Sequence, residues 1–438
     1  MVKRALLVMI QPPGCSGVQA LIYNKLLPFL ENSEWELHFA GPAPELVSVL
    51  TEKLDYPAER LHYTTNVSAS TRFSIRKNRC SKPSFPYVFF GLLQLLARWL
   101  ETLTGHDGQA FLLRGLGATI RQAERQWNFD LIAGKSPDFK VLTLVSEITQ
   151  ALNKPFFALI DDPYGARDES GFYPNQPDLQ RRIFEQSCGV LFMSPLTMKR
   201  YVEAGLVASN KAVHLTDSYP EMADLYSPNR SELSTNRRFA MGKPTLRMLY
   251  LGMLPEWRPI EPFLDALTRL HQQSDSSVAL QLDIYGYVYP AARQRIQEDP
   301  HLAKIIVIHP MVSYAQSHWL AEDADLQLVV IGPRHLDNYP SKFFEYLGHH
   351  KPVLVLGPLQ NPLKAVVDAL GIGLYVDGTD PQAIMDALTS ISLDYATLKQ
   401  AYQAHGDAIE AYSAHRVAGQ ICCVFDNALA RHAGISPW

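Results

Sequence analysis

The sequence of 438 residues lacks the features that mark several large classes of protein. Its five cysteines are odd in number and form no C-x-x-C pair, which excludes a disulfide framework and indicates free thiols in a reducing compartment. Forty basic and 44 acidic residues leave a formal charge of −4, too little to attract a polyanion, so we expect no nucleic-acid partner. No apolar run reaches the roughly 18–20 residues of a membrane span, and the first one, residues 5–10, is too short for a signal peptide. We therefore expect a soluble, cytoplasmic protein.

Motifs for common cofactors and metals are also missing. The chain has neither a G-x-G-x-x-G fingerprint nor the phosphate loop G-x-x-x-x-G-K-[ST]. Its 14 histidines include no H-E-x-x-H and no H-x-H, and His349 and His350 are predicted to be solvated in a helix-to-strand turn. Asp323 and Asp325 have the D-x-D spacing of a metal site, but their place at a helix end and a strand start favours chance. We expect no metal and no cofactor.

Two halves of the chain repeat one rhythm of strand, loop and helix. In the first half, residues 4–10 are a short apolar run, 11–17 a breaker-rich loop, 18–30 a helix with one apolar face, and 35–40 a second strand. Such a βαβ unit implies a parallel sheet with right-handed crossovers. Further strands are predicted at residues 130–133, 155–160, 190–193 and 212–215.

The rhythm lapses over residues 217–244, which we interpret as an interdomain linker, and then restarts. The predicted strands of the second half are 246–251, 279–285, 305–308, 325–331 and 352–356, and its predicted helices include 259–270, 380–391, 394–405 and 413–432. The predicted fold is α/β, with two Rossmann-like, doubly wound domains over residues 1–216 and 245–412 that face each other across a cleft.

Open parallel sheets bind ligands beyond the carboxyl ends of their strands, so the loops that follow strands are the candidate sites. After the first strand comes a loop with Ser16 and Gly17, which either lets a backbone approach a phosphate or sugar closely or forms only a turn. After the strand at 155–160 come Asp161 and Asp162, which either orient an acceptor hydroxyl or satisfy the amides of a turn.

The second domain carries a more specific pattern. The predicted helix at residues 339–347 starts with Ser341 and Lys342, which offer amide groups and positive charge to a diphosphate. Glu345 lies one turn deeper, where it accepts hydrogen bonds from vicinal hydroxyls such as those of a ribose, or pairs with Lys342. Arg258, in the loop after the strand at 246–251, is a second candidate cation for the same phosphates, although taken alone it is more typical of a surface arginine.

Nearly the whole chain resembles the retaining nucleotide-sugar glycosyltransferases of the GT-B fold, in their large family-four group. In the second domain the resemblance rests on LRMLYLGMLPEWRPIEPFLDAL, LQLDIYG, LAEDADLQLVV and above all YPSKFFEYLGHHKPVLV. In the first domain it rests on PPGCSGVQALIYNKLLPFL, FDLIAGKSPD and KPFFALIDDPYG. The last helix, at about 413–438, resembles the one that crosses back to the first domain in this family.

The resemblance implies roles for particular residues. It implies that Arg258, Lys342 and the helix start at Ser341 stabilise the departing diphosphate, and that no protein side chain is required as a general base. It also implies that Glu345 holds the ribose and Asp337 the donor sugar.

The resemblance further assigns the loops at Gly252 and Gly17 to the donor site and leaves Asp162 and Ser16 on the acceptor side. The chain departs from the family where Asp337 stands for a glutamate and where Met253 and Asp161 stand for arginines.

Two alternatives of function and one of location stay open. The departures allow a non-catalytic nucleotide-sugar binder that supports a partner transferase, and the same fold allows a sugar-nucleotide epimerase. Residues 72–82 contain five cations and precede an aromatic-aliphatic helix, so residues 72–100 form either an ordinary loop and core helix or a peripheral contact with the inner face of the membrane. The acceptor is then a sugar, a lipid-linked molecule or another hydroxyl compound.

Overall fold

The computed structural model divides the chain into two compact units. It describes residues 2–15, 17–31, 34–47, 56–78, 80, 84–104, 108–136, 139–168, 171–221, 245–272, 279–337 and 339–435. Unit 1 consists of Met1–Ala166, Phe172–Thr216 and Val417–Trp438, and unit 2 consists of Arg167–Gly171 and Asp217–Arg416. Of the predicted linker, residues 222–244 lie outside the described residues, while Tyr219 forms a β-bridge to Ser413 within unit 2.

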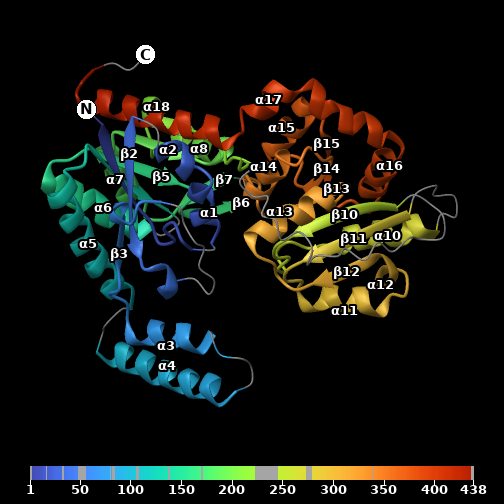
Figure 1. Ribbon diagram of the computed structural model, residues 1–438, viewed down its shortest axis with the longest axis horizontal. Coiled ribbons are helices and arrows are strands. Elements are labelled where there is room, and N and C mark those ends of the chain that lie inside the picture. The colour runs from blue at the N-terminus through green and yellow to red at the C-terminus, as the bar shows by residue number, and fades with distance from the viewer. Residues whose placement is uncertain are drawn as a thin grey trace. The chain divides into compact units, whose positions relative to one another are not determined.

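Unit 1 is built on a parallel sheet of seven strands in the order β3-β2-β1-β4-β5-β8-β9 (Figure 1). Its strands are β1 (Lys3–Val8), β2 (Trp35–Pro42), β3 (Leu61–Thr64), β4 (Leu131–Lys135), β5 (Phe156–Ile160), β8 (Gly189–Phe192) and β9 (Ala212–His214). A small hairpin joins β6 (Gly165–Asp168) to β7 (Gly171–Pro174). β5 is buried along its whole length and β1 from Ala5 onwards, because helices cover both faces of a parallel sheet.

The helices of unit 1 form its core and an outlying hairpin. They are α1 (Val18–Asn24), α2 (Leu27–Glu31), α3 (Ala69–Asn78), α4 (Phe85–Leu103), α5 (Gly108–Trp127), α6 (Phe139–Leu152), α7 (Pro177–Gln186) and α8 (Pro195–Glu203). The predicted single helix over 18–30 is wrong in this respect: Pro28 lacks an amide hydrogen and clashes with the carbonyl four residues earlier, so the chain breaks into α1 and α2.

The last helix, α18 (Ala414–His432), starts in unit 2 and continues on unit 1 from Val417 onwards. There the Asp426 carboxylate accepts hydrogen bonds from Lys3 Nζ at 2.6 Å and from Trp35 Nε1 at 3.0 Å. The ring of Phe425 packs edge-on against those of Trp35 and Phe157. This helix therefore closes unit 1 beside its first strands.

Unit 2 repeats the arrangement with six parallel strands in the order β12-β11-β10-β13-β14-β15. These strands are β10 (Thr245–Leu251), β11 (Ala279–Tyr285), β12 (Ile306–His309), β13 (Leu326–Val330), β14 (Val353–Gly357) and β15 (Gly373–Asp377). The helices are α10 (Glu261–Gln272), α11 (Pro290–Glu298), α12 (Leu302–Ile305), α13 (Tyr314–Asp323), α14 (Ser341–Leu347), α15 (Leu363–Leu370), α16 (Pro381–Ala404) and α17 (Gly406–Glu410). In both units the strand order reverses beside the first strand, between β1 and β4 and between β10 and β13.

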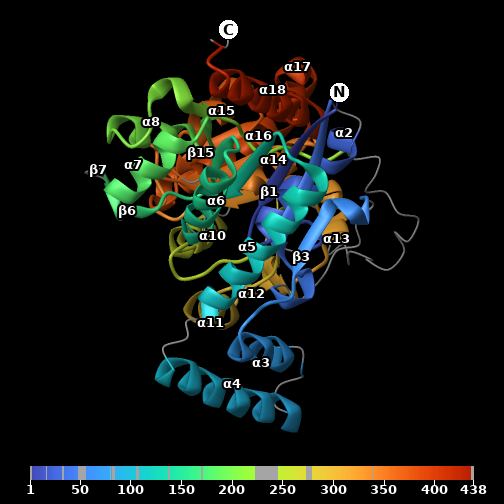
Figure 2. The same ribbon diagram turned by 90° about the vertical axis from the view of Figure 1, so that its left-hand side faces the viewer.

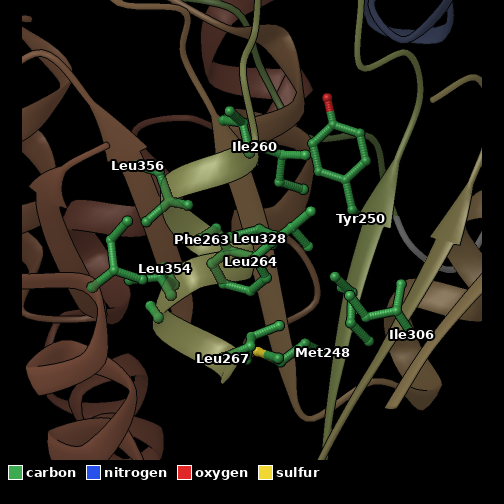
Figure 3. Close-up of a cluster of buried hydrophobic side chains, with 14 of the residues drawn as sticks. Met248, Tyr250, Ile260, Phe263, Leu264, Leu267, Ile306, Leu328, Leu354 and Leu356 are labelled. Atoms are coloured by element: carbon green, nitrogen blue, oxygen red, sulfur yellow. The ribbon is translucent and has the colours of Figure 1, made fainter. Parts of the chain in front are cut away.

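Alternate residues of the unit 2 strands pack into two separate cores. Met248 and Tyr250 face the core under α10, where they meet Phe263, Leu264 and Leu267 (Figure 3). The intervening strand residues face the opposite core, which α14 completes with its aromatic side chains. Both faces of this sheet are therefore buried, and the loops at its carboxyl edge are left for a ligand.

Two predictions about single features meet different outcomes. The turn after α14 was expected to be solvated, and this is wrong for His349: it is 4% exposed and lies 2.9 Å from His318 Nδ1 and 3.3 Å from Glu322 Oε2. His350 is exposed. None of the helices in the described ranges has both the length and the apolar content that crossing a membrane requires.

Candidate functional site

The loops after β10 and β13 meet at the point where the strand order of unit 2 reverses. Gly252 opens the first loop with a φ of +113°, a backbone conformation that residues with a side chain rarely adopt. In the second loop, a Cβ added to Gly332 would lie 2.2 Å from the carbonyl oxygen of Trp257. The two loops are therefore in direct contact at the edge where open α/β sheets bind ligands.

The side chain of Lys342 lies against Gly252. A Cβ at Gly252 would stand 2.9 Å from Lys342 Cε, so a side chain at this position would displace the lysine. Lys342 is the second residue of α14, directly after Ser341, and both residues are half-buried. The structure thus brings together three of the residues predicted to bind the donor.

Arg258 lies at the end of the same first loop. Its guanidinium is 4.7 Å from the centre of the Trp257 ring, a cation–π contact, and its Nε is buried with no hydrogen-bond partner among the described residues. The hydroxyl of Tyr250 donates to the carbonyl of Met253 at 2.9 Å, which ties the loop to β10. Burial raises the pKa of Tyr250, and the charge of Arg258 acts in the opposite direction. Arg258 is therefore a positioned cation rather than a solvated surface residue.

The two predicted acidic residues are buried. Glu345 is 9% exposed on α14, between aromatic residues that enter the core, and Asp337 is 2% exposed in the loop after β13. Burial and the neighbouring groups Tyr250 and Glu345 raise the pKa of Tyr346. Because α14 has only seven residues, its dipole is short and the side chains carry most of the electrostatic effect here.

Three residues at this edge were not assigned by sequence reasoning. The rings of Trp257 and His335 lie 4.8 Å apart, and Asn361 Nδ2 donates to the His335 carbonyl at 3.3 Å. Trp257 follows β10, His335 follows β13 and Asn361 follows β14. Their position after a predicted strand was therefore the one sequence feature that could have indicated them. Their chemical type gave no such indication, because a lone tryptophan, histidine or asparagine in a loop is common.

The corresponding edge of unit 1 contains an ion pair that sequence reasoning missed. The Lys135 side chain is 1% exposed at the end of β4 and pairs with Asp161 after β5, and its Nζ lies 5.2 Å from the centre of the Tyr23 ring. The Asp161 amide donates to Ser136 Oγ at 2.8 Å. Asp161, which stands where the resembling family has an arginine, is therefore held by a lysine from the neighbouring strand.

Of the two predicted acceptor-side residues, one lies next to this ion pair and the other lies outside the described residues. Asp162 is exposed, next to Asp161, and Ser16 lies outside the described residues. Gly17 caps α1 with an ordinary extended backbone (φ −78°), and a Cβ there would overlap the Gln11 side-chain amide. Gln19 Nε2 donates to the Ser136 carbonyl at 3.1 Å, so the start of α1 is joined to the loop after β4. Gly17 belongs to unit 1, whereas the other predicted donor residues belong to unit 2.

The D-x-D pair lies at the amino edge of the unit 2 sheet. Arg247 Nη1 donates to Asp323 Oδ2 at 2.7 Å, and the Arg247 amide donates to Asp325 Oδ2 at 2.9 Å. Both carboxylates therefore tie a helix end and a strand start to β10, at the opposite end of the strands from the ligand edge.

Comparisons with known proteins show likeness at the level of structure. No protein-family model and no curated protein sequence matches the chain. Sucrose-phosphate synthase from Thermosynechococcus elongatus is 13% identical with a TM-score of 0.61 over 98% of this chain and all of the other, and a glycosyltransferase from Rickettsia africae is 12% identical with a TM-score of 0.63 over 98% of both. HepE from Anabaena, solved with UDP and with UDP-glucose, is 13% identical and covers 97% of this chain, with TM-scores of 0.60 and 0.58.

The likeness extends to a second kind of enzyme. A structure of a putative UDP-N-acetylglucosamine 2-epimerase from Listeria monocytogenes is 10% identical, with a TM-score of 0.56 over 98% of this chain and 97% of the other. All these chains match over nearly their full length, and the order of strands in both sheets is the Rossmann order. The chain therefore has the GT-B fold, a glycosyltransferase-like fold that enzymes binding nucleotide sugars share.

Proposed function

We propose that the chain is a glycosyltransferase that moves a sugar from a nucleoside diphosphate sugar to an acceptor hydroxyl with retention at the anomeric carbon. The observation that carries this proposal is the contact of Lys342 with Gly252 at the reversal of strand order in unit 2, with Arg258 in the adjoining loop. Two cations and a glycine turn are suited to a diphosphate. The fold is shared with HepE, which was solved with UDP-glucose.

The chemical task of such a transfer is to stabilise the negative charge that develops on the departing diphosphate. Lys342 and Arg258 supply positive charge, and Arg258 is oriented in advance by the Trp257 ring. Cations fixed before the reaction stabilise the leaving group without further reorganisation, and this kind of electrostatic stabilisation is often the largest contribution to catalysis. The Ser341 hydroxyl adds a neutral donor at the same helix start.

The remaining donor contacts follow from position. Glu345 is proposed to bind the ribose hydroxyls from one turn deeper in α14. Asp337 is proposed to bind the donor sugar, which requires the loop after β13 to open, because the residue is 2% exposed.

Unit 1 is proposed to hold the acceptor, with Asp162 and Ser16 as the acceptor-side residues. A departing phosphate oxygen takes the acceptor proton in this scheme, so neither a general base nor a metal or other cofactor is needed. The Lys135–Asp161 pair is proposed to keep the loop after β5 in place, because both partners come from strands that flank the acceptor edge. The acceptor is a sugar, a lipid-linked molecule or another compound with a hydroxyl group.

Calorimetry with UDP and GDP, on the wild type and on Glu345→Ala, tests the donor site. We expect one of the two nucleotides to bind, and the variant to bind it at least about tenfold more weakly, since a charged hydrogen bond contributes about 1.5–3 kcal/mol. Glu322→Ala is the matched control, because it removes a glutamate from the same unit that hydrogen-bonds His349 instead. Equal nucleotide affinity in Glu345→Ala and the control would remove the donor-site assignment.

A donor assay then separates the transferase from two other functions. The epimerase reading is supported by the likeness to the Listeria structure and predicts an isomerised donor in the absence of any acceptor. A non-catalytic binder would bind nucleotide and turn over no donor with any acceptor. Release of the nucleotide together with a glycosylated acceptor supports the transferase.

A further inference from the structure

The hairpin of α3 and α4 stands apart from the Rossmann core of unit 1. Figures 1 and 2 both show the two helices side by side beyond the end of the sheet, with α4 on the outer side. On the inner face of α4, Gln94 Oε1 accepts a hydrogen bond from Lys77 Nζ of α3 at 2.9 Å, Glu101 accepts one from Ser70 Oγ at 2.6 Å, and Ala97 is buried. This face, which packs on α3, is mixed: it also carries Tyr87, whose ring lies under Lys77 Nζ, and Leu93, which lines a pocket with Phe73 of α3.

The opposite face of α4 is apolar and exposed. Nine large apolar side chains recur there at spacings of three and four residues, which places them on one stripe. Each is between 46% and 82% exposed: Phe85, Val88, Phe89, Leu92, Leu95, Leu96, Trp99, Leu100 and Leu103. The interpretation of this segment as an ordinary core helix is therefore wrong, because most of this apolar face is exposed; Leu96 and Leu100, at its edge, also line a pocket with Phe73 of α3.

The charge of the hairpin identifies what covers this stripe. Residues 69–104 contain six basic residues (Arg72, Arg76, Lys77, Arg79, Lys82, Arg98) and one acidic residue (Glu101), a net of +5 in a chain whose total is −4. Arg72 and Arg76 on α3 and Arg98 on α4 are exposed, while Arg79 and Lys82 lie outside the described residues. A second copy of the chain would bring two such positive hairpins together, whereas an anionic lipid surface attracts them.

We propose that the α3–α4 hairpin binds an anionic membrane surface, with α4 lying in the interface. An apolar stripe with phenylalanine, tryptophan and leucine, next to cations, is the pattern of helices that lie in the plane of the headgroups. The 19 residues of α4 extend about 28 Å along this plane. The inference is independent of sugar transfer, and it would place unit 1 beside acceptors that are themselves held in the membrane.

Flotation with vesicles tests the proposal. We compare vesicles of phosphatidylcholine alone with vesicles that also contain phosphatidylglycerol, using the full chain. The wild type is expected to float with the anionic vesicles, and salt is expected to weaken the binding. The triple variant Leu92→Gln, Leu95→Gln, Trp99→Gln is expected to lose at least about tenfold in bound fraction, because its apolar contact is removed.

A matched control separates this effect from a general loss of surface apolarity. Met311→Gln, Leu359→Gln, Leu393→Gln changes three side chains in unit 2 that are 64%, 48% and 73% exposed, and it is expected to float like the wild type. Circular dichroism and the midpoint of urea unfolding report whether each variant is folded. The proposal is overturned if the wild type stays at the bottom with every vesicle, if the α4 variant floats as well as the wild type, or if the wild type is a dimer without lipid and the α4 variant a monomer.

Discussion

At the scale of single residues, the contact between Gly252 and Lys342 connects backbone conformation to ligand binding. Gly252→Ala adds a methyl group where φ is +113° and where Lys342 Cε would lie 2.9 Å away. We expect a loss of about 1–3 kcal/mol in the free energy of unfolding from the backbone strain. We also expect nucleotide binding at least about tenfold weaker, because the lysine that is proposed to bind the diphosphate must move. Urea unfolding and calorimetry measure the two effects separately.

Gly371→Ala is the control for this prediction. Gly371 also has a positive φ, of +59°, but a Cβ there meets nothing within 4 Å. It should lower stability by about 1 kcal/mol and leave nucleotide affinity unchanged. If both variants bind nucleotide like the wild type, the position of Lys342 is not set by the absence of a side chain at Gly252.

A second prediction at this scale concerns the ion pair at the ligand edge of unit 1. Lys135→Met removes the positive partner of Asp161 while keeping the length of a side chain that is 1% exposed. We expect a loss of about 3–5 kcal/mol in the free energy of unfolding, since removing one member of a buried pair leaves the other charge unpaired. Adding Asp161→Asn should restore part of that loss. The single variant Asp161→Asn completes the comparison. If the double variant loses as much free energy of unfolding as the two single variants together, the two residues are not coupled.

At the scale of elements, neighbouring strands β2 and β3 carry a pair of stacked histidines. His38 Nδ1 lies 2.9 Å from His62 Nε2, and the rings are 5.2 Å apart. Burial is the main reason why the pKa of His38 falls to about 4, although its contact with Glu36 opposes the shift, and burial also lowers the pKa of His62. The folded protein therefore keeps His38 neutral at a pH where the unfolded chain already binds a proton.

The consequence is a loss of stability in acid. Between pH 6.5 and 4 the unfolded state binds more protons than the folded state, so the free energy of unfolding decreases as the pH falls. We expect His38 to contribute on the order of 1–2 kcal/mol of this decrease at pH 5. Urea unfolding at pH 7 and pH 5 measures it, and His38→Gln should reduce the difference. An unchanged difference in this variant would mean that other groups, such as the half-buried His214, account for the effect.

The elements that could be predicted from the sequence are those with a strong apolar pattern. The predicted strand at 279–285 coincides with β11, and the split between predicted helices at 380–391 and 394–405 corresponds to the non-helical backbone of Asp394 within α16. The edge strands β3 and β15 were not predicted, because only parts of them are buried and the apolar signal is short. For α4 the pattern gave the helix but not its orientation, because a stripe of leucine has the same spacing whether it faces a core or a membrane.

The candidate site could be predicted only in part, for a related reason. Position after a strand and residue type together indicated Lys342, Arg258 and Glu345. The structure places Arg258 in the loop after β10, Lys342 at the start of α14 and Glu345 one turn further along that helix. Lys135 was not assigned, since a lysine at the end of an apolar strand has no distinctive spacing, and its burial depends on Asp161 from another strand. Contacts between residues far apart in the chain are not encoded in a local pattern.

At the scale of the whole molecule, two units with separate cores allow donor and acceptor binding to be observed separately. When a nucleoside diphosphate is added, amide hydrogen exchange is expected to slow in peptides covering residues 252–258 and 332–347, where the loops after β10 and β13 meet. Peptides covering β4 and β5, including Lys135 and Asp161, should change much less, because they belong to the other unit. Protection of the unit 1 edge alone would place the nucleotide on the wrong unit and would reverse the proposed roles of the two domains.

Stabilisation by ligand binding reaches about 2.7 kcal/mol at a hundredfold excess over Kd, so the exchange rates of the protected amides should fall by up to about a hundredfold. Glu345→Ala, with affinity about tenfold weaker, should lower this protection by about tenfold at the same nucleotide concentration while leaving exchange in unit 1 as it was.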